Sequence, residues 1–248
     1  MKKEPKNRQN LNFERGLLPH WVQEKLSARP DAQDLLNRHE AEEPWEYILG
    51  EISFYDCRVR VDQRALIPRC ETELLVDLIV KLTPQGTLWD LCTGSGCIGI
   101  ALKKHLPHLD VSLSDLSSDA LSLALENCQI NQIDLPLYQG DLLTPFQGKK
   151  ADYIVCNPPY VSEEEYLFLD LSVKAFEPKM ALVAKNRGLF FYQRLAVEAL
   201  DYLPSGGQNF LDIGHFQIKA VKEISKYTKD ILVIVGFIDQ DKNKIGPD

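Results

Sequence analysis

The sequence predicts an α/β protein of the Rossmann-like type, with a mostly parallel twisted sheet and a small helical domain before it. Two patterns support this fold class. After Glu71, strand-like apolar segments alternate with helical segments of roughly 10 to 15 residues, an arrangement that forms parallel sheets with right-handed crossovers. Before residue 50, apolar side chains recur at the three- and four-residue steps of helices.

The first fifty residues predict three short helices. One runs from Leu17 to Leu26, and a second begins after Asp31, which we expect to cap it. The third spans Pro44 to Leu49, and Gly50 is placed to end it. Residues 1–50 are therefore expected to form a small helical domain.

The hydrophobic period changes to two after Glu51, which predicts a β-hairpin linker over residues 51–68. Residues 69–248 carry the alternating pattern of the large domain. Its expected helices cover residues 72–82, 97–106, 118–130, about 188–203 and about 216–228, with Ser118 as the cap of the third. Its expected strands cover residues 87–92, 110–115, about 136–140, 153–156, 208–213 and 231–237.

Composition narrows the class of protein. The 248 residues include 28 Lys and Arg against 36 Asp and Glu, a net charge of −8. With 44% hydrophobic and 26% charged residues, the chain is typical of a globular protein and not of a disordered, collagenous or coiled-coil one. The acidic balance argues against a nucleic-acid substrate, because duplex binding depends on clustered Lys and Arg.

Cysteine and histidine usage predicts no metal site. The six Cys and five His are dispersed without ligand spacing, which suits reduced thiols in a cytoplasm. No apolar run reaches the length of a membrane span, and the first ten residues lack the apolar segment of a secretory signal. We therefore expect a cytoplasmic protein without a membrane anchor, and a monomer.

A glycine-rich turn follows the first strand of the predicted sheet. Gly94, Gly96 and Gly99 fit the pattern GxGxxG between a strand and a helix, and Asp115 lies 21 residues after Gly94 at the end of the next strand. Such glycines let the backbone approach a nucleotide, and such an acid receives two ribose hydroxyls. The pattern suits a dinucleotide, S-adenosylmethionine or a simple packing turn. Asp90, just before the turn, favours a cationic methionine group over a pyrophosphate.

The tetrapeptide Asn157-Pro158-Pro159-Tyr160 follows the strand at residues 153–156. Two prolines could simply end that strand. The position is also the carboxyl edge where open α/β sheets bind ligands. A planar NH2 group is a poor nucleophile unless two acceptors hold its hydrogens beneath a methyl donor. We expect the Asn157 side-chain oxygen and the Pro158 carbonyl to be those acceptors, and Tyr160 to form an aromatic wall. No strong base is required, because the nitrogen becomes acidic after transfer.

Several motifs together resemble the PrmC (HemK) family of peptide-chain release factor N5-glutamine methyltransferases. The segment from Leu66 to Glu73 matches the family's I-P-R-x-E-T-E signature, and Asn157 to Tyr160 matches its N-P-P-Y. The resemblance covers nearly everything from Glu43 onward, and includes Glu177-Pro178. Cys92 stands where the family usually has a glycine.

The resemblance implies a class I methyltransferase fold, S-adenosylmethionine as cofactor and release factors as protein substrates. Residues 1–50 would then recognise the substrate, and residues 69–248 would bind the methyl donor. The cofactor-binding residues are expected to be Asp90, Cys92, Thr93, Gly94, Ser95, Gly96, Asp115, Asp141, Leu142 and Asn157. The substrate-binding residues are expected to be Asn157, Pro158, Pro159 and Tyr160, with Asn157, Pro158 and Tyr160 as the catalytic ones.

Three other activities remain open at this point. Methylation of a ribosomal-protein glutamine would use the same catalytic residues. A DNA adenine or RNA amino-methyltransferase would need a flipped base and a basic recognition region, which the charge of −8 disfavours. A nicotinamide-dependent dehydrogenase or a non-catalytic nucleotide-binding module would also carry the glycine-rich turn.

Overall fold

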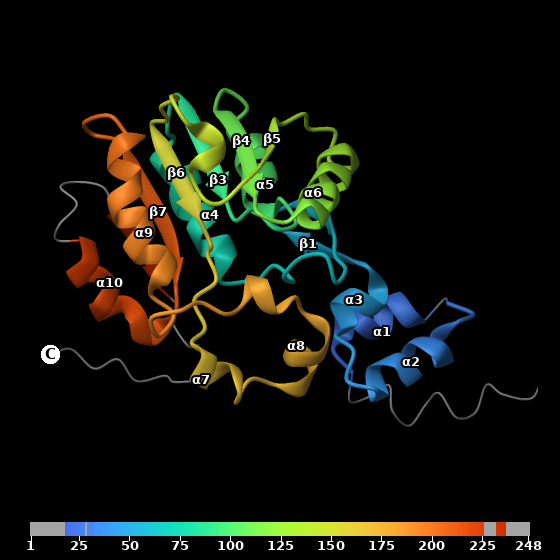
Figure 1. Ribbon diagram of the computed structural model, residues 1–248. Helices are drawn as coiled ribbons and strands as arrows, with labels where there is room; N and C mark the ends of the chain where they lie inside the picture. Colours follow the sequence, from blue (N-terminus) through green and yellow to red (C-terminus); the bar gives the residue numbers. More distant parts are fainter. Residues whose placement is uncertain (1–17, 28, 226–231, 237–248) are drawn as a thin grey trace, which may run out of the picture.

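A six-stranded sheet forms the centre of the larger part of the chain in the computed structural model, which describes residues 18–27, 29–225 and 232–236 (Figure 1). Its strand order is β5-β4-β3-β6-β7-β8, and every pairing in it is parallel. The strands are β3 (Thr87–Leu91), β4 (Asp110–Asp115), β5 (Leu137–Gln139), β6 (Tyr153–Cys156), β7 (Gln208–Ile213) and β8 (Leu232–Gly236). The predicted α/β fold is confirmed; Ile231 and Phe237 lie outside the described residues.

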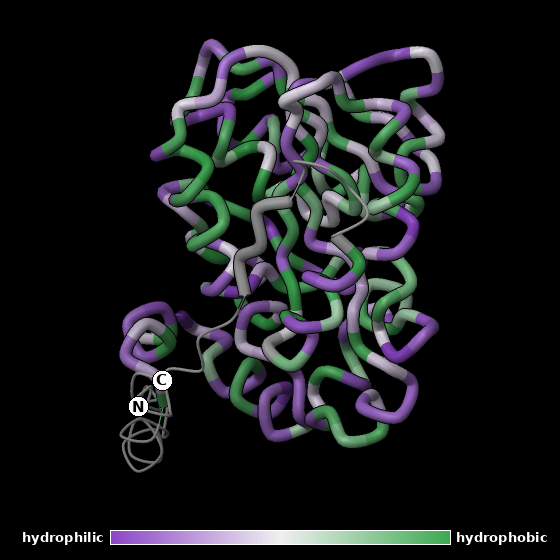
Figure 2. The backbone as a smooth tube through the Cα atoms, turned by 90° about the vertical axis from the view of Figure 1, so that its left-hand side faces the viewer, coloured by the Kyte–Doolittle hydropathy of each residue, from purple (hydrophilic) through white to green (hydrophobic). Residues whose placement is uncertain are grey.

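Helices cover both faces of this sheet (Figure 1). They are α4 (Thr72–Leu82), α5 (Cys97–His105), α6 (Ser118–Ile130), α9 (Phe190–Glu198) and α10 (Ile218–Ser225). Leu88 of β3 packs with α4, α5 and α6 on one face, whereas Trp89 packs with α9 and α10 on the other. Because successive strand residues are buried on opposite faces, the strands are largely apolar on both faces, as in other parallel sheets. Buried Asp90 of β3 and Asp212 of β7 are exceptions. Figure 2 shows these hydrophobic segments between more hydrophilic turns.

Two expectations about helix ends in this part are wrong. The cap of α6 is Ser117, not Ser118: its hydroxyl accepts a hydrogen bond from Ala120 N at 3.2 Å. Ser117 holds the extended backbone that a cap needs, because its own N–H is bound to Asp115 Oδ1. The helix expected over residues 188–203 covers only Phe190–Glu198, and a 3-10 turn at Ala199–Asp201 follows it.

The N-terminal helices are α1 (His20–Leu26), α2 (Ala32–Glu40) and α3 (Trp45–Leu49). Their buried side chains form a small cluster of their own, in which the Trp45 ring stacks on His39 at 4.3 Å. Gly50 ends α3 in the left-handed conformation, as expected. Asp31 precedes α2 but makes no capping hydrogen bond, because its carboxylate is bound by Arg29.

A strand pair links this helical unit to the sheet. Strands β1 (Glu51–Phe54) and β2 (Cys57–Arg60) are antiparallel, as the period-two pattern indicates. Buried Phe54, Cys57 and Val59 join the same apolar cluster as α4 and α5. The Asn127 side chain of α6 holds β2 by accepting from Arg60 N at 2.7 Å and donating to its carbonyl at 3.0 Å. The hairpin is thereby fixed against the large domain.

The chain between β6 and α9 departs from the alternation of helix and strand. It contains the short helices α7 (Glu163–Tyr166) and α8 (Leu171–Phe176) and a 3-10 turn at Lys179–Ala181. None of these was expected from the sequence. In Figure 1 this segment lies below the sheet, next to the N-terminal helices. It forms the far side of the cavity described next.

Candidate active site

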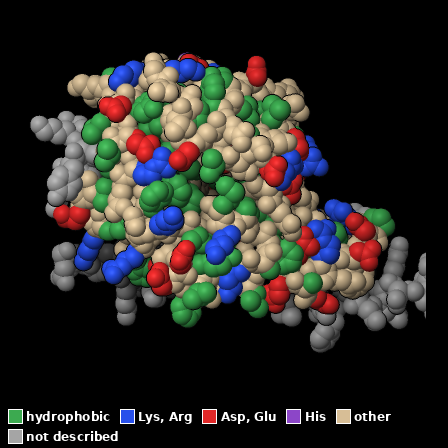
Figure 3. Space-filling model, in the orientation of Figure 1, with side chains coloured by type: hydrophobic (Ala, Val, Ile, Leu, Met, Phe, Trp, Pro, Cys, Tyr) green, Lys and Arg blue, Asp and Glu red, His purple; other side chains and the backbone are tan. Residues whose placement is uncertain are grey.

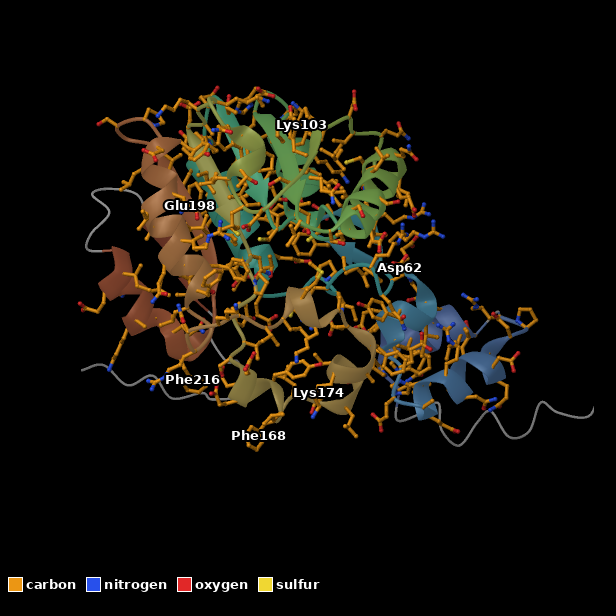
Figure 4. All side chains as sticks on the ribbon, viewed as in Figure 1. Asp62, Lys103, Phe168, Lys174, Glu198 and Phe216 are labelled. Carbon is orange, nitrogen blue, oxygen red and sulfur yellow. The ribbon has the colours of Figure 1, made fainter. Side chains whose placement is uncertain are left out.

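A cavity opens where the strand order reverses. Strands β3 and β6 are neighbours, but the chain leaves β3 toward β4 on one side and reaches β6 on the other. The turns after β3 and β6 therefore diverge, which leaves a crevice at the carboxyl ends of the strands. Figure 3 shows the molecule in the orientation of Figure 1. Hydrophobic side chains lie near the centre of this side, with acidic and basic side chains interspersed.

Most of the sequence-predicted site residues meet at this cavity. Its lining includes Cys92, Thr93, Gly94, Ser95, Asp115, Asp141, Leu142, Asn157 and Pro159. The predicted residues Asp90, Gly96, Pro158 and Tyr160 are not part of the lining. Their proposed roles, like those of the lining residues, remain predictions.

Asp90 supports the glycine-rich turn from beneath. Its Oδ2 atom accepts hydrogen bonds from Thr93 Oγ1 at 2.6 Å and from Gly99 N at 2.9 Å. The side chain is fully buried, and this burial raises the pKa of Asp90 to about 7. Its Oδ1 atom has no partner among the described residues. Asp90 thus shapes the turn, since it joins the turn to the first residues of α5.

Asp115 fixes the turn from the side. Its Oδ2 atom accepts from Gly94 N at 2.8 Å, and its Oδ1 atom accepts from Ser117 N at 2.9 Å. Burial raises the pKa of Asp115, which nevertheless lines the cavity. A carboxylate held by two backbone N–H groups is well oriented to accept from ligand hydroxyls.

The backbone of the turn explains its residue types. Gly94 and Gly96 have φ values of +54° and +81°, in the region that favours glycine. Cys92 also has a positive φ, +53°. This is the position at which the family that the sequence resembles usually has a glycine. Gly99 is required for packing instead, because a Cβ atom there would lie 2.2 Å from Leu113 Cδ2. Helix α5 can therefore approach β4 closely.

Arg194 of α9 binds Asp141, one of the expected cofactor-binding residues, and the sequence did not predict this contact. Its Nη1 atom lies 2.8 Å from both carboxylate oxygens of Asp141, and its Nε donates to Glu198 at 2.6 Å. The Asp141 carboxylate is thus already paired. Leu142 is buried, and Phe191 of α9 also lines the cavity. An aromatic ring therefore reaches this part of the cavity from a helix that the sequence did not implicate.

Asn157 presents one end of its side-chain amide to the cavity. Its Nδ2 atom donates to Thr72 Oγ1 at 3.3 Å. Its Oδ1 atom accepts no hydrogen bond from any other residue within the described ranges. The neighbouring Pro158 carbonyl likewise accepts none from the described backbone. Of the two predicted acceptors, only Asn157 belongs to a residue of the cavity lining. Pro158 is buried and lies outside the lining, so the role of its carbonyl stays a prediction.

Tyr160 packs with the apolar cluster that includes residues of α9 and α10. Its carbonyl accepts from Gln217 Nε2 at 2.8 Å. A Cβ atom on Gly188 would lie 2.0 Å from that same carbonyl, so only glycine fits at residue 188. Burial raises the pKa of Tyr160 to about 12, which keeps its hydroxyl neutral.

Glu177 joins the segment below the sheet to residues 66–73. Its carboxylate accepts from Ile67 N at 3.1 Å and from Arg69 Nη2 at 2.6 Å, and its side chain is buried. This contact joins two stretches that both line the cavity: Pro178, Met180 and Ala181 on one, and Ala65, Leu66 and Pro68 on the other. Both segments belong to motifs of the resemblance, but neither was assigned to the site from the sequence.

Two further features bear on the classes of site considered above. Within the described ranges, no group of three or more His, Cys, Asp or Glu could hold a metal ion. Across the same part of the chain, no helix is both long enough and apolar enough to cross a membrane.

Comparisons with known proteins give methyltransferases among the relatives of this chain. Residues 70–176 match the methyltransferase small domain family. The chain is 42% identical over 185 residues to the release factor glutamine methyltransferase of Chlamydia trachomatis serovar L2, covering 73% of this chain and 63% of that one. It is 41% identical over 196 residues to the enzyme of that name from Lactococcus lactis subsp. lactis, covering 77% of this chain and 72% of that one. It thus spans less than two thirds of the chlamydial relative's length.

A solved structure supports the fold. A methyltransferase from Pyrococcus furiosus superposes with a TM-score of 0.52 at 17% identity, covering 68% of this chain and 76% of that one. The sheet and its helices therefore have the class I methyltransferase arrangement that the resemblance implied.

Proposed function

Because the chain belongs to the release factor glutamine methyltransferase family, we propose that it methylates the N5 amide nitrogen of a glutamine. The methyl donor is S-adenosylmethionine, and the substrate glutamine lies in the Gly-Gly-Gln motif of a peptide-chain release factor. The observation that carries this proposal is the Asn157 amide, whose Nδ2 atom is bound to Thr72 while its Oδ1 atom stays available at the cavity.

The cavity fits S-adenosylmethionine better than a dinucleotide. Arg64 is the one Lys or Arg in the lining of the described cavity, and its guanidinium is already bound by Asp62 and Glu126. A pyrophosphate would thus meet no available cation in the lining of the cavity. The sulfonium of S-adenosylmethionine is instead compatible with an acidic, mostly apolar site.

Asp115 and the glycine-rich turn would hold the donor. Asp115 would accept from the ribose hydroxyls, and the backbone of residues 92–96 would lie against the methionine part. Leu142 and Phe191 would contact the adenine. When bound, S-adenosylmethionine supplies an electrophilic methyl group; the protein contributes the geometry in which the amide meets it.

Asn157 would prepare the substrate amide for transfer. Its Oδ1 atom would accept one amide hydrogen and the Pro158 carbonyl the other, so the nitrogen is held with its plane toward the methyl group. The nitrogen would gain the methyl group as the methyl–sulfur bond of the donor breaks, which would leave the sulfur as a neutral thioether, and it would then lose one hydrogen as a proton to water. No basic side chain is needed for that step, because the methylated nitrogen carries a positive charge until the proton leaves.

The remaining elements of the proposal concern the setting of the reaction. We propose that the protein acts in the cytoplasm as a monomer, and that residues 1–50 form a substrate-recognition domain before a hairpin linker (51–68) and the donor-binding domain (69–248). The interspersed charges on the cavity face support a protein substrate over bare nucleic acid (Figure 3).

Mass spectrometry tests the proposal directly. A purified release factor is incubated with the protein and S-adenosylmethionine, and its Gly-Gly-Gln peptide is expected to become heavier by one methyl group. A release factor with glutamate in place of that glutamine is the control and should stay unmodified. Intact ribosomes are treated in parallel. Labelling of a ribosomal protein without labelling of the release factor would overturn the substrate assignment in favour of the sister activity.

A further inference from the structure

A buried hydrogen-bond chain runs from the site into the sheet. Asn157 Nδ2 donates to Thr72 Oγ1 at 3.3 Å, and Thr72 Oγ1 donates to Asp212 Oδ2 at 2.8 Å. The side chains come from the turn after β6, the first residue of α4 and strand β7. Thr72 is 1% exposed and Asp212 is 4% exposed, so water does not compete for these bonds.

The chemistry of the three groups gives this chain one direction. An ionised carboxylate can only accept hydrogen bonds, so Asp212 takes the single hydroxyl hydrogen of Thr72. The Thr72 oxygen then has only lone pairs left to offer to Asn157. It can therefore bind the NH2 end of the Asn157 amide but not the oxygen end. The Oδ1 atom of Asn157 is left at the cavity.

We propose that Thr72 and Asp212 are positioning residues that hold the Asn157 amide with its oxygen toward the substrate. The inference rests on the proposed function for its catalytic consequence, although the orientation itself can be measured separately. Without this chain, the amide could rotate by half a turn. It would then present an NH2 group to another NH2 group, and the substrate amide would lose an acceptor.

The charge of Asp212 makes the orientation sensitive to pH. Burial raises the pKa of Asp212 to about 6, and Glu71 raises it as well. The Tyr160 and Tyr192 hydroxyls also face Asp212, and burial keeps both neutral near pH 7. Below about pH 6 Asp212 gains a proton and can donate to Thr72, so the direction of the chain is no longer imposed. Turnover should therefore fall on the acid side.

Thr72 is tested with a pair of variants. Thr72→Val keeps the shape but removes the hydroxyl, and we expect kcat for methylation to fall about 10- to 100-fold. Thr72→Ser restores the hydroxyl and should recover kcat to within about threefold. Donor affinity, measured by calorimetry, should stay within about threefold in both. Thr87→Val is the matched control and should behave as wild type, because Thr87 lies at the amino end of β3, outside the cavity lining.

Asp212 is tested through the pH profile. Asp212→Asn removes the titrating group and can present either an oxygen or an NH2 to Thr72, so kcat at pH 7.5 should fall about 10-fold. The acid limb of the kcat profile near pH 6 should disappear in this variant. Asp152→Asn, whose carboxylate accepts from Thr87 N at 2.8 Å far from the cavity, is the control and should retain the limb.

NMR reads the orientation without any turnover. Hydrogen exchange of the Asn157 side-chain NH2 in ¹⁵N-labelled protein should accelerate about fivefold or more in Thr72→Val but not in Thr72→Ser. Equal exchange and equal kcat in wild type and Thr72→Val would overturn the inference. If wild-type protein transfers no methyl group but shows the expected exchange pattern, the proposed function fails and the positioning role stands.

Discussion

The two sides of the cavity are built in different ways. On the donor side, the turn of residues 92–96 is held by hydrogen bonds between close neighbours: Thr93 to Asp90 spans three residues, Gly99 to Asp90 nine, and Gly94 to Asp115 21. On the acceptor side, residues 157–160 and 66–73 are held by bonds between distant parts of the chain. Asn157 to Thr72 spans 85 residues, Arg69 to Glu177 108, and Thr72 to Asp212 140.

The two sides of the cavity therefore depend on different parts of the fold. The turn of residues 92–96 on the donor side needs one strand–turn–helix unit and the neighbouring strand, so it forms once that part of the sheet is in place. The acceptor side needs β6, α4, β7 and the segment below the sheet to be packed together first. Long-range contacts carry the entropy cost of ordering the chain between them. Substitutions on the acceptor side are therefore expected to affect catalysis and folding, and those on the donor side mainly affinity.

The largest effect is expected for Asn157→Ala. The variant lacks an oriented acceptor for the substrate amide, so kcat should fall about 10²- to 10³-fold, as for loss of one preorganised polar group. Affinity for S-adenosylmethionine should fall far less than kcat, because the turn of residues 92–96 is held by Asp90 and Asp115 and not by Asn157. Steady-state kinetics and calorimetry measure the two quantities. Gln129→Ala, an exposed position of α6 outside the cavity lining, is the control, and near-normal turnover in Asn157→Ala would remove Asn157 from its proposed role.

Glu177→Ala removes the hydrogen bonds between Glu177 and residues 67 and 69, which lie far away in the sequence, and leaves the proposed catalytic residues unchanged. It leaves Ile67 N and the Arg69 guanidinium without their buried acceptor, so the free energy of unfolding should fall by about 2–4 kcal/mol. Urea denaturation measures this loss. Glu177→Gln keeps one acceptor oxygen and should lose clearly less. Equal stability of the alanine variant and wild type would show that the acceptor side does not rely on this tie.

Asp115→Ala is the matching change on the donor side. The variant removes the acceptor of Gly94 N and Ser117 N and of the expected ribose hydroxyls, so affinity for S-adenosylmethionine should fall about 10- to 100-fold. At saturating donor, kcat should stay within about threefold, since Asn157 is undisturbed. A large loss of kcat with unchanged affinity would reverse the assignment of the two sides.

The same contrast explains what could be predicted from the sequence. The positions of the strands and helices follow from local periodicity, and the glycine-rich turn and Asp115 follow from fixed spacing. The structure places Gly94 of the turn and Asp115 at one cavity. The strand order also brings Asn157 to that cavity, since parallel strands end at one edge. The contacts that join these parts connect residues that lie close together in the folded protein but far apart in the sequence.

The unpredicted contacts share one physical origin. The bond from Thr72 to Asp212 and the ion pair of Arg194 with Asp141 link residues 140 and 53 positions apart. No periodicity relates such positions, because the packing of separate elements brings them together. The missed cap at Ser117 is a smaller case: a bond from its N–H to Asp115 decides between two adjacent serines.

The smallest effect is expected for Tyr160→Phe, which asks whether the acceptor side uses a ring or a hydroxyl. Since burial raises the pKa of Tyr160 to about 12, the hydroxyl does not ionise near pH 7 and cannot serve as a base. The backbone carbonyl, not the hydroxyl, ties the residue to Gln217. Turnover should thus stay within about threefold and its pH profile should keep its shape. Tyr160→Ala, which removes the ring as well, should lose more, because the apolar cluster of α9 and α10 would lose the ring that packs against it next to residues 157–159. A hundredfold loss in the phenylalanine variant would instead assign the hydroxyl a part in the transfer, and proton movement would then join positioning on the acceptor side.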